Sequence, residues 1–334
     1  MVNVDYHRDL KQVQSDGQLA LWLSESNQRA PFDRLEWFSM LAEHCGIAPL
    51  MAVARDGNEL AVLPLTGKSG ELTALSNWYS FRFRPLAAKS DTLLAALARD
   101  LRKRAHRVTL HGVPDEDGSA ARLEQAFGKA GWMVSRTRCD TNHVLLIAGR
   151  GYDEYIASRP GPLRTTLKRK SGKVATTVFD RFDADAWAAY EDIYAESWKT
   201  AEGSPDFLRA FAMAEGQAGR LRLGVAHVGG EAVAAQMWTV EGGTAWIHKL
   251  AHRESAKPFS PGSVLSAALF RHVIDIDKVD LVDFGTGDDP YKRDWMEIVR
   301  PRYRLDMVRP LDPRNWLNIA KRAARRLAAA AKRG

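Results

Sequence analysis

Acidic, basic and aromatic residues follow one another near the end of the sequence, with types and spacing that suit proton transfer. Asp283 ends an apolar segment that predicts a strand, Leu281–Phe284, and Tyr291 and Lys292 come soon after it. A carboxylate whose pKa is raised by partial burial can accept a proton. A lysine can stabilise developing negative charge, and a tyrosine can protonate a leaving group. The alternatives are a turn-forming aspartate and two exposed residues of a short helix.

His248 and Lys249 are neighbours on another predicted strand, Thr244–Ala251. Successive side chains of a strand point to opposite faces, so we expect only one of the two to face a cleft. The imidazole has the better ordinary pKa for a base at neutral pH, although a single strand histidine is usually structural. The spacing from His248 to His252 would join two metal ligands only on a helix, so we expect no metal site.

Gly262 precedes an apolar segment, Val264–Ile274, whose periodicity predicts a helix. The first amides of a helix have no partner within it, and they lie at the positive end of its dipole. A diphosphate can bind there. Ser260 and Ser263 lie in the same turn. The alternative is an ordinary helix start after a Pro-Gly turn.

An aromatic stripe follows the predicted helix N-cap Asp183. Trp187, Tyr190, Tyr194 and Trp198 recur three or four residues apart, which places them on one helix face. Such a stripe is usually core. We interpret it so for all but Trp198, which lies near the helix end and could line a ligand site.

The composition bounds the class of protein. A length of 334 residues predicts two domains. The two cysteines, Cys45 and Cys139, lie in different halves without metal-binding spacing, which makes a zinc site or a disulfide framework unexpected. We find neither a secretory signal nor an apolar run long enough to span a membrane, and we therefore expect a cytoplasmic protein.

The net charge of +7 is concentrated at the C-terminus. Residues 313–334 contain seven basic residues and no acidic one, so residues 1–312 are formally neutral and do not indicate DNA binding. The apolar and basic residues of 313–334 fall on opposite sides of a helix, an arrangement that suits an anionic membrane surface. The alternative is a frayed or disordered basic end.

A second basic cluster runs from Arg159 to Lys173. Such a run is usually a solvated helix face. It could also contact the phosphates of a nucleotide-sugar, a lipid headgroup or a tRNA. The run contains no aromatic residue, which makes stacking on bases, and with it tRNA, less attractive.

The predicted elements follow a similar order in both halves, which indicates an internal duplication. In the first half we predict a helix at Pro31–Cys45, a hairpin at Met51–Leu65, an extended segment at Leu72–Leu75, a helix at Thr92–Arg104, a strand at Val108–His111, a helix at Ala120–Ala130 and strand material at Met133–Ile147. In the second half we predict a helix at Asp183–Lys199, strands at Arg220–Val228, Ala232–Val240 and Thr244–Ala251, a helix at Val264–Ile274, a strand at Leu281–Phe284, a short segment at Tyr291–Met296 and a strand at Tyr303–Val308.

Short motifs spread over most of the chain carry a family resemblance. They are Pro31-Phe32, Glu36-Trp37, Leu63-Pro64-Leu65, Leu163-Arg164, Lys168-Arg169-Lys170, Ser197-Trp198-Lys199, Lys249, Ser260-Pro261-Gly262, Asp283-Phe284-Gly285, Tyr291-Lys292 and Trp295. Together they resemble the CelD/BcsL-like and FemAB-like proteins of the GNAT acyltransferase superfamily. The loop Ser260-Pro261-Gly262-Ser263 departs from the usual pyrophosphate loop of that superfamily, in which Arg or Gln is followed by x-x-Gly-x-Gly or Ala.

The resemblance implies an α+β fold of two tandem GNAT-like domains, with mixed, mostly antiparallel sheets flanked by helices. We place an N-terminal domain at 1–150, an acyltransferase domain at 151–312 and a basic amphipathic helix or tail at 313–334. In such sheets the strand after the antiparallel meander separates from the next strand. Here Thr244–Ala251 would separate from Leu281–Phe284, and a pantetheine arm would lie between them.

The resemblance also implies a set of site residues. The expected catalytic residues are Asp283, Lys292, Lys249 and Tyr291, with His248 second to Lys249. The expected cofactor-binding residues are Ser260, Gly262 and Ser263. The expected substrate-binding residues are Trp198, Lys199, Gly285 and Trp295.

We therefore expect an acyl-CoA-dependent N- or O-acyltransferase that acts on an envelope-related acceptor. The acceptor would be a sugar or a long-chain amine, which includes ceramide-type amide formation. Expected partners are acyl-CoA, a small amine or hydroxyl acceptor and an anionic membrane surface reached through the tail, with no metal and no DNA. One alternative is a FemAB-like aminoacyl-tRNA-dependent peptidyl aminoacyltransferase. The other is a non-catalytic accessory protein of polysaccharide biosynthesis.

Overall fold

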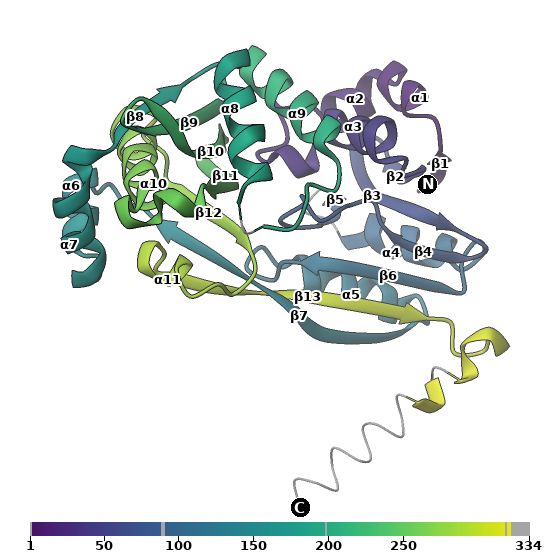
Figure 1. Ribbon diagram of the computed structural model, residues 1–334. Helices are drawn as coiled ribbons and strands as arrows, with labels where there is room; N and C mark the ends of the chain where they lie inside the picture. The colour runs from purple at the N-terminus through teal and green to yellow at the C-terminus, as the bar shows by residue number, and fades with distance from the viewer. Residues whose placement is uncertain (1, 88–90, 198, 318, 322–334) are drawn as a thin grey trace, which may run out of the picture. The chain divides into compact units, whose positions relative to one another are not determined.

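The computed structural model describes residues 2–87, 91–197, 199–317 and 319–321 (Figure 1). The chain divides into two compact units. Unit 1 comprises residues 1–27, 32–140 and the chain from 301 onward, and unit 2 comprises residues 28–31 and 141–300. Each unit is described by itself.

The two units differ from the predicted division at residues 150 and 312. Strand β7 (Met133–Leu146) begins in unit 1 and ends in unit 2, and β13 (Ile298–Val308) leads back into unit 1. The end of β13 belongs to unit 1 because it pairs with β6 (Arg107–Val113) in antiparallel register, Met307 opposite Val108. The two paired strands are far apart in sequence, so their pairing leaves no local pattern. The predicted division therefore assigned residues 301–312 to the second domain, whereas they belong to unit 1.

Unit 1 contains a mixed sheet with the strand order β1-β2-β3-β4-β6-β13, and β5 pairs with β3. Strands β4 and β6 run parallel, while β1, β2 and β3 form an antiparallel meander. Its further strands are β1 (Asn3–His7), β2 (Pro49–Asp56), β3 (Glu59–Lys68), β4 (Glu71–Ala74) and β5 (Leu86–Ala87). Its helices are α1 (Leu10–Ser15), α2 (Gly17–Trp22), α3 (Leu35–Cys45), α4 (Asp91–Leu101) and α5 (Ser119–Lys129).

Unit 2 repeats this plan with the strand order β7-β12-β11-β10-β9-β8. Strands β11 and β12 run parallel, and β8 to β11 form an antiparallel meander. Its strands besides β7 are β8 (Ala175–Phe179), β9 (Leu221–Val228), β10 (Glu231–Glu241), β11 (Thr244–His252) and β12 (Leu281–Thr286). Its helices are α6 (Tyr152–Ala157), α7 (Gly161–Lys170), α8 (Ala184–Ala195), α9 (Pro205–Gln217), α10 (Pro261–Arg271) and α11 (Lys292–Trp295).

The predicted α+β class, with mixed and mostly antiparallel sheets flanked by helices, is confirmed. The predicted helices and strands occur in the predicted order, and Asp183 caps α8 by accepting a hydrogen bond from the Ala186 amide. Helix α8 ends at Ala195, not at Lys199, and α9 was not predicted. The Gly-Ser-Pro turn before α9 places a proline at the first helical position, which is a typical helix start.

An aromatic cluster fixes α10 against the sheet of unit 2. The Phe270 ring stacks on Trp295 at 4.9 Å between centroids and on Tyr155 at 5.3 Å, and its edge meets Trp238 at 5.1 Å. Such pairs contribute about 0.5–1.5 kcal/mol each beyond the area they bury. The last turn of α10 is therefore held in a defined place, and the helix packs on β9 and β10.

The basic amphipathic helix or tail was predicted at residues 313–334, of which 318 and 322–334 lie outside the described residues. In the described part, Pro313–Asn315 form a 3-10 turn, and residues 316–317 and 319–321 are helical. Trp316 and Leu317 are exposed. No helix within the described part of the chain has the length and hydrophobicity needed to cross a membrane.

Two glycines of unit 2 provide a matched test of its packing. A Cβ added to Gly216 in α9 would lie 2.5 Å from the backbone nitrogen of Phe182, whereas one added to Gly224 in β9 would lie 2.9 Å from leucine methyl groups of Leu265 and Leu269. We expect Gly216→Ala to lower the free energy of unfolding by about 1–3 kcal/mol, although alanine is the better helix former. Gly224→Ala should cost less because side chains move more easily than backbone. Thermal denaturation measures both, and a Gly216→Ala protein that melts at or above the wild-type midpoint would contradict this packing.

Candidate functional site

The parallel strands β11 and β12 pair for only part of their length. Thr244, Ala245 and Trp246 are in register with Leu281, Val282 and Asp283, and the pairing stops there. Strand β11 nevertheless continues to His252 and β12 to Thr286. The predicted separation of these two strands is therefore present, and it begins at Trp246 and Asp283.

A cavity of about 260 Å³ lies beside this separation, at the start of α10. We call it the α10 cavity. It brings together four of the predicted site residues, namely Gly262, Ser263, Tyr291 and Trp295. The rest of its lining is Leu163, Gln236, Leu250, His252, Ser266, Phe284 and Asp294.

The first turn of α10 offers few backbone donors. Pro261 has no amide hydrogen, and the Val264 amide donates to the Ser260 carbonyl at 3.1 Å. The amides of Gly262 and Ser263 lie at the positive end of the helix dipole, which attracts anions. The Gln236 amide nitrogen donates to the Gly262 carbonyl at 3.0 Å and fixes the turn to β10.

A second cavity, of about 570 Å³, lies between α8 and α9. We call it the α8 cavity. Its walls include the aromatic stripe Trp187, Tyr190 and Tyr194, so these rings serve as core and as cavity wall at once. Trp198 lies outside the described residues. The rest of the lining is Glu191, Ala195, Lys199, Ala201, Glu202, Pro205 and Leu208.

A buried ion pair closes one side of the α8 cavity. The Lys249 Nζ atom lies 2.8 Å from a carboxylate oxygen of Glu202, and both side chains are about one-tenth exposed, at 8% and 11%. Burial lowers the pKa of Lys249, against the opposing effect of Glu202. Burial, followed by the positive charge of Lys249, lowers the pKa of Lys199 to about 8. Two lysines and one carboxylate therefore share a small, poorly hydrated space.

The prediction that His248 and Lys249 point to opposite faces is wrong. A β-bulge interrupts the register, since Met237 is opposite Lys249 while the next residue, Trp238, is opposite Ile247. His248 is the extra residue of the bulge, and its Nε2 lies 2.8 Å from Thr239 Oγ1, on the same face as Lys249. Alternation fails wherever a bulge adds a residue.

His248 does not have the protonation properties of a base. Burial, reinforced by Lys249, lowers the pKa of its imidazole to about 3. The ring also packs edge-on against Phe211 at 5.1 Å. A base with so low a pKa is neutral at pH 7 but has little affinity for a proton, which favours a structural role.

Asp283 is a buried carboxylate that organises the end of β12. It accepts hydrogen bonds from the Asn142 side chain at 2.7 Å and from the Gly285 amide at 2.8 Å. The Asn142 amide nitrogen also donates to the Gly285 carbonyl at 3.1 Å. This is the turn-forming alternative for Asp283. It also fixes the point at which β11 and β12 separate, and Gly285 takes part as backbone.

Lys292 and Tyr291 occupy the loop that follows β12. The buried Lys292 ammonium donates to the carbonyls of Thr286 and Gly287 and lies 5.4 Å from the Phe284 ring. These hydrogen bonds of Lys292 hold the loop after β12 in place. Burial is the main cause that raises the pKa of the Tyr291 phenol, and the charge of Asp289 raises it further. The phenol is therefore a weaker proton donor.

In unit 1 the place equivalent to the β11–β12 separation is filled by the chain itself. The parallel pair β4 and β6 ends at Thr73 and Thr109, and the segment after β4 then covers β6. The Phe83 amide donates to the Gly112 carbonyl at 3.1 Å, and Phe81 and Phe83 are buried. A ligand arm cannot occupy a position that Phe83 already holds.

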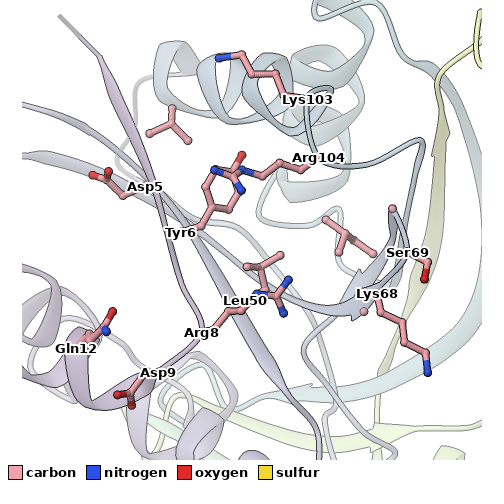
Figure 2. Close-up of a pocket in the computed structure, with 14 residues that line it drawn as sticks. Asp5, Tyr6, Arg8, Asp9, Gln12, Leu50, Lys68, Ser69, Lys103 and Arg104 are labelled. Carbon is pink, nitrogen blue, oxygen red and sulfur yellow. The ribbon is translucent and has the colours of Figure 1, made fainter.

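Unit 1 has a cavity of its own, of about 760 Å³, at another place (Figure 2). It is lined from β1, the β3–β4 turn and the turn after α4, and Figure 2 shows Tyr6 and Arg104 side by side within it. The Arg104 guanidinium lies 3.9 Å from the centre of the Tyr6 ring, whose hydroxyl donates to Asp100 at 2.9 Å. These contacts are internal, and the cavity adjoins none of the predicted site residues.

Two important residues were missed by sequence reasoning. Glu202 lies in a loop with no repeat or motif, and its pairing with Lys249 appears only in three dimensions. Asn142 lies far from Asp283 in sequence and reaches it through the β7–β12 pairing. No group of three His, Cys, Asp or Glu side chains in the described part of the chain is arranged to hold a metal ion.

We expect Asp283→Ala to destabilise the protein, because it removes the Oδ1 atom that accepts from both the Asn142 side chain and the Gly285 amide. A buried donor left without a partner costs about 1–3 kcal/mol. Chemical denaturation followed by fluorescence measures the loss, with Asp180→Ala at an exposed carboxylate as control. An Asp283→Ala protein as stable as the control would show that these hydrogen bonds do not hold the end of β12.

Comparison with protein families finds one match. Residues 162–293 match the family model described as an acetyltransferase (GNAT) domain. The matched segment begins in α7 and ends in α11, and it includes β11, β12 and the start of α10. Comparison of the sequence with curated proteins finds no match.

Solved structures share the fold of nearly the whole chain. FemX is 11% identical with a TM-score of 0.64, over 94% of this chain and 99% of that chain. L-PGS from Bacillus licheniformis is 13% identical with a TM-score of 0.58, over 96% of both chains. A tandem GNAT protein from the clavulanic acid biosynthesis pathway is 14% identical with a TM-score of 0.54, over 93% of this chain and 100% of that chain. At these identities the likeness is one of fold.

Proposed function

We propose that the chain, as an acyltransferase whose residues 162–293 match the acetyltransferase (GNAT) domain, uses acyl-CoA or a related thioester as its donor. It transfers the acyl group to an amine or hydroxyl group. The observation that carries this proposal is the separation of β11 and β12 after Trp246 and Asp283, beside the α10 cavity. Unit 2 carries the reaction, because Phe83 fills the equivalent place in unit 1.

The donor lies with its pantetheine arm along the free edge of β11. Beyond Trp246 this edge presents backbone groups that β12 does not use, and they can pair with the amides of the arm. The thiol end then points toward the separation, and the phosphate end toward Gly262 and Ser263. Leu250 and Phe284 exclude water from the arm.

The acceptor lies in the α8 cavity. Its aromatic and aliphatic walls can bury the alkyl chain of a long-chain amine, which a sugar does not have. Glu202 attracts the ammonium group of such an amine. A long-chain acceptor resides in a membrane, so the proposal includes peripheral association through the basic residues 313–334.

Lys199 is the base in this proposal. An amine attacks a thioester only as the free base, so its ammonium group must lose a proton. The lowered pKa of Lys199, about 8, makes its neutral form accessible near physiological pH. Lys249 positions Glu202, and Asp283 positions the backbone at the separation.

A second candidate function rests on two of the structural neighbours. FemX and L-PGS share the fold over nearly their entire length. This likeness favours an aminoacyl-tRNA donor as the alternative to a coenzyme A thioester. The third candidate, a non-catalytic accessory protein, predicts that changes to Lys199 leave the cellular role intact.

The donor class is tested by product formation. We expect the purified protein to acylate a long-chain amine with acyl-CoA, to form an amide identified by mass spectrometry, and to be indifferent to ribonuclease. Loss of activity after ribonuclease treatment would replace the thioester donor with tRNA. The absence of any enzyme-dependent product over a series of acyl-CoAs and amines would end the proposal.

The role of Lys199 has a pH signature. Below pH 8 its amine is mostly protonated, so kcat should rise with pH and level off above about 8. Lys199→Met should remove this limb and lower kcat by about 10² to 10⁴-fold. Lys129→Met, at an exposed lysine of α5, is the control. A Lys199→Met protein that keeps the wild-type pH profile would assign the base elsewhere.

Substitutions at Glu202 and Lys249 distinguish a role in stability from a role in function. Glu202→Gln leaves a buried ammonium without its carboxylate and should lower the free energy of unfolding by about 3 kcal/mol. Glu202→Leu with Lys249→Met removes both charges and should restore stability to within about 1 kcal/mol, while activity stays lost. Denaturation and product formation measure the two effects. A stable, fully active double variant would exclude the pair from the site.

A further inference from the structure

We propose that the acyl thioester is delivered by an acidic carrier protein, which docks on the exposed cations of α7 and the turn after it. This inference rests on the proposed thioester chemistry and names the source of the donor. The docking surface, called the α7 cationic face, consists of Arg164, Lys168, Arg169, Lys170 and Lys173.

The α7 cationic face carries uncompensated charge. The sequence contains no acidic residue between Tyr155 and Phe179. Within the described residues, none of the five cations of the face has an ion pair, and each is exposed or half-exposed. Five like charges on one short helix and its turn repel one another, so a negatively charged partner would stabilise this surface.

Most of the other arginines of unit 2 are paired, which sets the face apart. The Arg222 guanidinium contacts Asp277 at 2.6 Å, and Arg220 contacts Glu215 at 2.8 Å. Further pairs of the same unit are Arg150–Glu297, Arg159–Glu297, Arg253–Asp192, Arg271–Asp153 and Arg293–Asp288. The unpaired charge at α7 is therefore local to it and is not a general property of the unit.

The face lies next to the donor site. Leu163 and Leu167 are the buried residues of α7, and Leu163 also lines the α10 cavity. Helix α7 packs against α10, as Figure 1 shows for unit 2. A protein bound to the outer side of α7 would thus have its prosthetic arm within reach of the cavity that holds the thioester.

The surface does not suit a membrane or a nucleic acid as well. No large hydrophobic side chain between residues 152 and 179 is exposed, so a lipid bilayer would gain charge contacts without insertion. The segment 156–178 contains no aromatic residue to stack on a base. A folded acidic protein needs neither feature, because surface charge alone gives orientation and fast association.

The α10 cavity agrees with a carrier-bound arm. Its volume of about 260 Å³ lies just below the usual range of ligand sites, about 300–1,000 Å³. A slender pantetheine arm fits, whereas the nucleotide of coenzyme A would remain outside. Pro261 removes one of the amides that would hold a diphosphate, and a carrier-bound arm has only a single phosphate.

The transfer step balances without a further reactant. The lone pair of the neutral acceptor amine attacks the thioester carbonyl carbon, a C–N bond forms and the C–S bond breaks. The electron pair of that bond leaves with the sulfur of the carrier's arm. The proton lost by the amine ends on the resulting thiolate, so the products are an amide and the free thiol of the carrier.

The test compares three donors that share one acyl chain. Hexadecanoyl thioesters of a purified acyl carrier protein, of coenzyme A and of pantetheine are given to the wild type and to Arg164→Glu/Lys168→Glu, with a long-chain amine as acceptor. We expect the variant to lose about 10-fold or more in kcat/KM with the carrier-bound donor and to keep its rate with hexadecanoyl-pantetheine. Lys129→Glu/Arg181→Glu, at exposed cations elsewhere, is the matched control.

Binding of the carrier protein without acceptor is measured separately by biolayer interferometry at low and high salt. Salt-sensitive binding that the variant loses supports the docking surface even if no donor yields product, in which case only the proposed acceptor or reaction fails. Turnover of hexadecanoyl-CoA, with no binding and no turnover of the carrier-bound thioester, leaves the proposed function standing and overturns this inference. Equal losses for all three donors, or binding of tRNA in place of the carrier, overturn it as well.

Discussion

The early end of the β11–β12 pairing is the constraint on which the rest of unit 2 depends. Parallel strands normally continue pairing, because an unpaired backbone amide or carbonyl is costly once it is buried. Here Asp283 and Asn142 satisfy the polar groups at the end of β12, so the strand can turn away from β11 without that cost. The edge of β11 that is left over is the feature that a ligand with its own amides can complete.

The charges around the α8 cavity follow from the same geometry. The bulge at His248 places two successive side chains on one face, which directs Lys249 toward Glu202 while Leu250 still faces α10. Burial is the main cause of the low pKa of Lys199, and the neighbouring charge of Lys249 lowers that pKa further. One added residue in a strand thus sets the electrostatics of the cavity.

Much of this arrangement was predictable from sequence, and the reasons for the failures are physical. Local periodicity and turn residues gave the helices and strands, and the resemblance of the Asp283–Trp295 region gave the superfamily and the strand separation. The bulge at His248, the Asn142–Asp283 contact and the Glu202–Lys249 pair have no local pattern, because each joins residues that only the folded sheet brings together. The assigned roles of the site residues stay predictions.

The return of β13 to unit 1 has a consequence for how the chain is made. Residues 303–308 complete the sheet of unit 1 by pairing with β6, yet they are synthesised after all of unit 2. Domains usually fold in the order in which they leave the ribosome. In this chain the inserted unit is complete first, and the sheet of unit 1 must wait with an open edge at β6 until residues 303–308 have been synthesised.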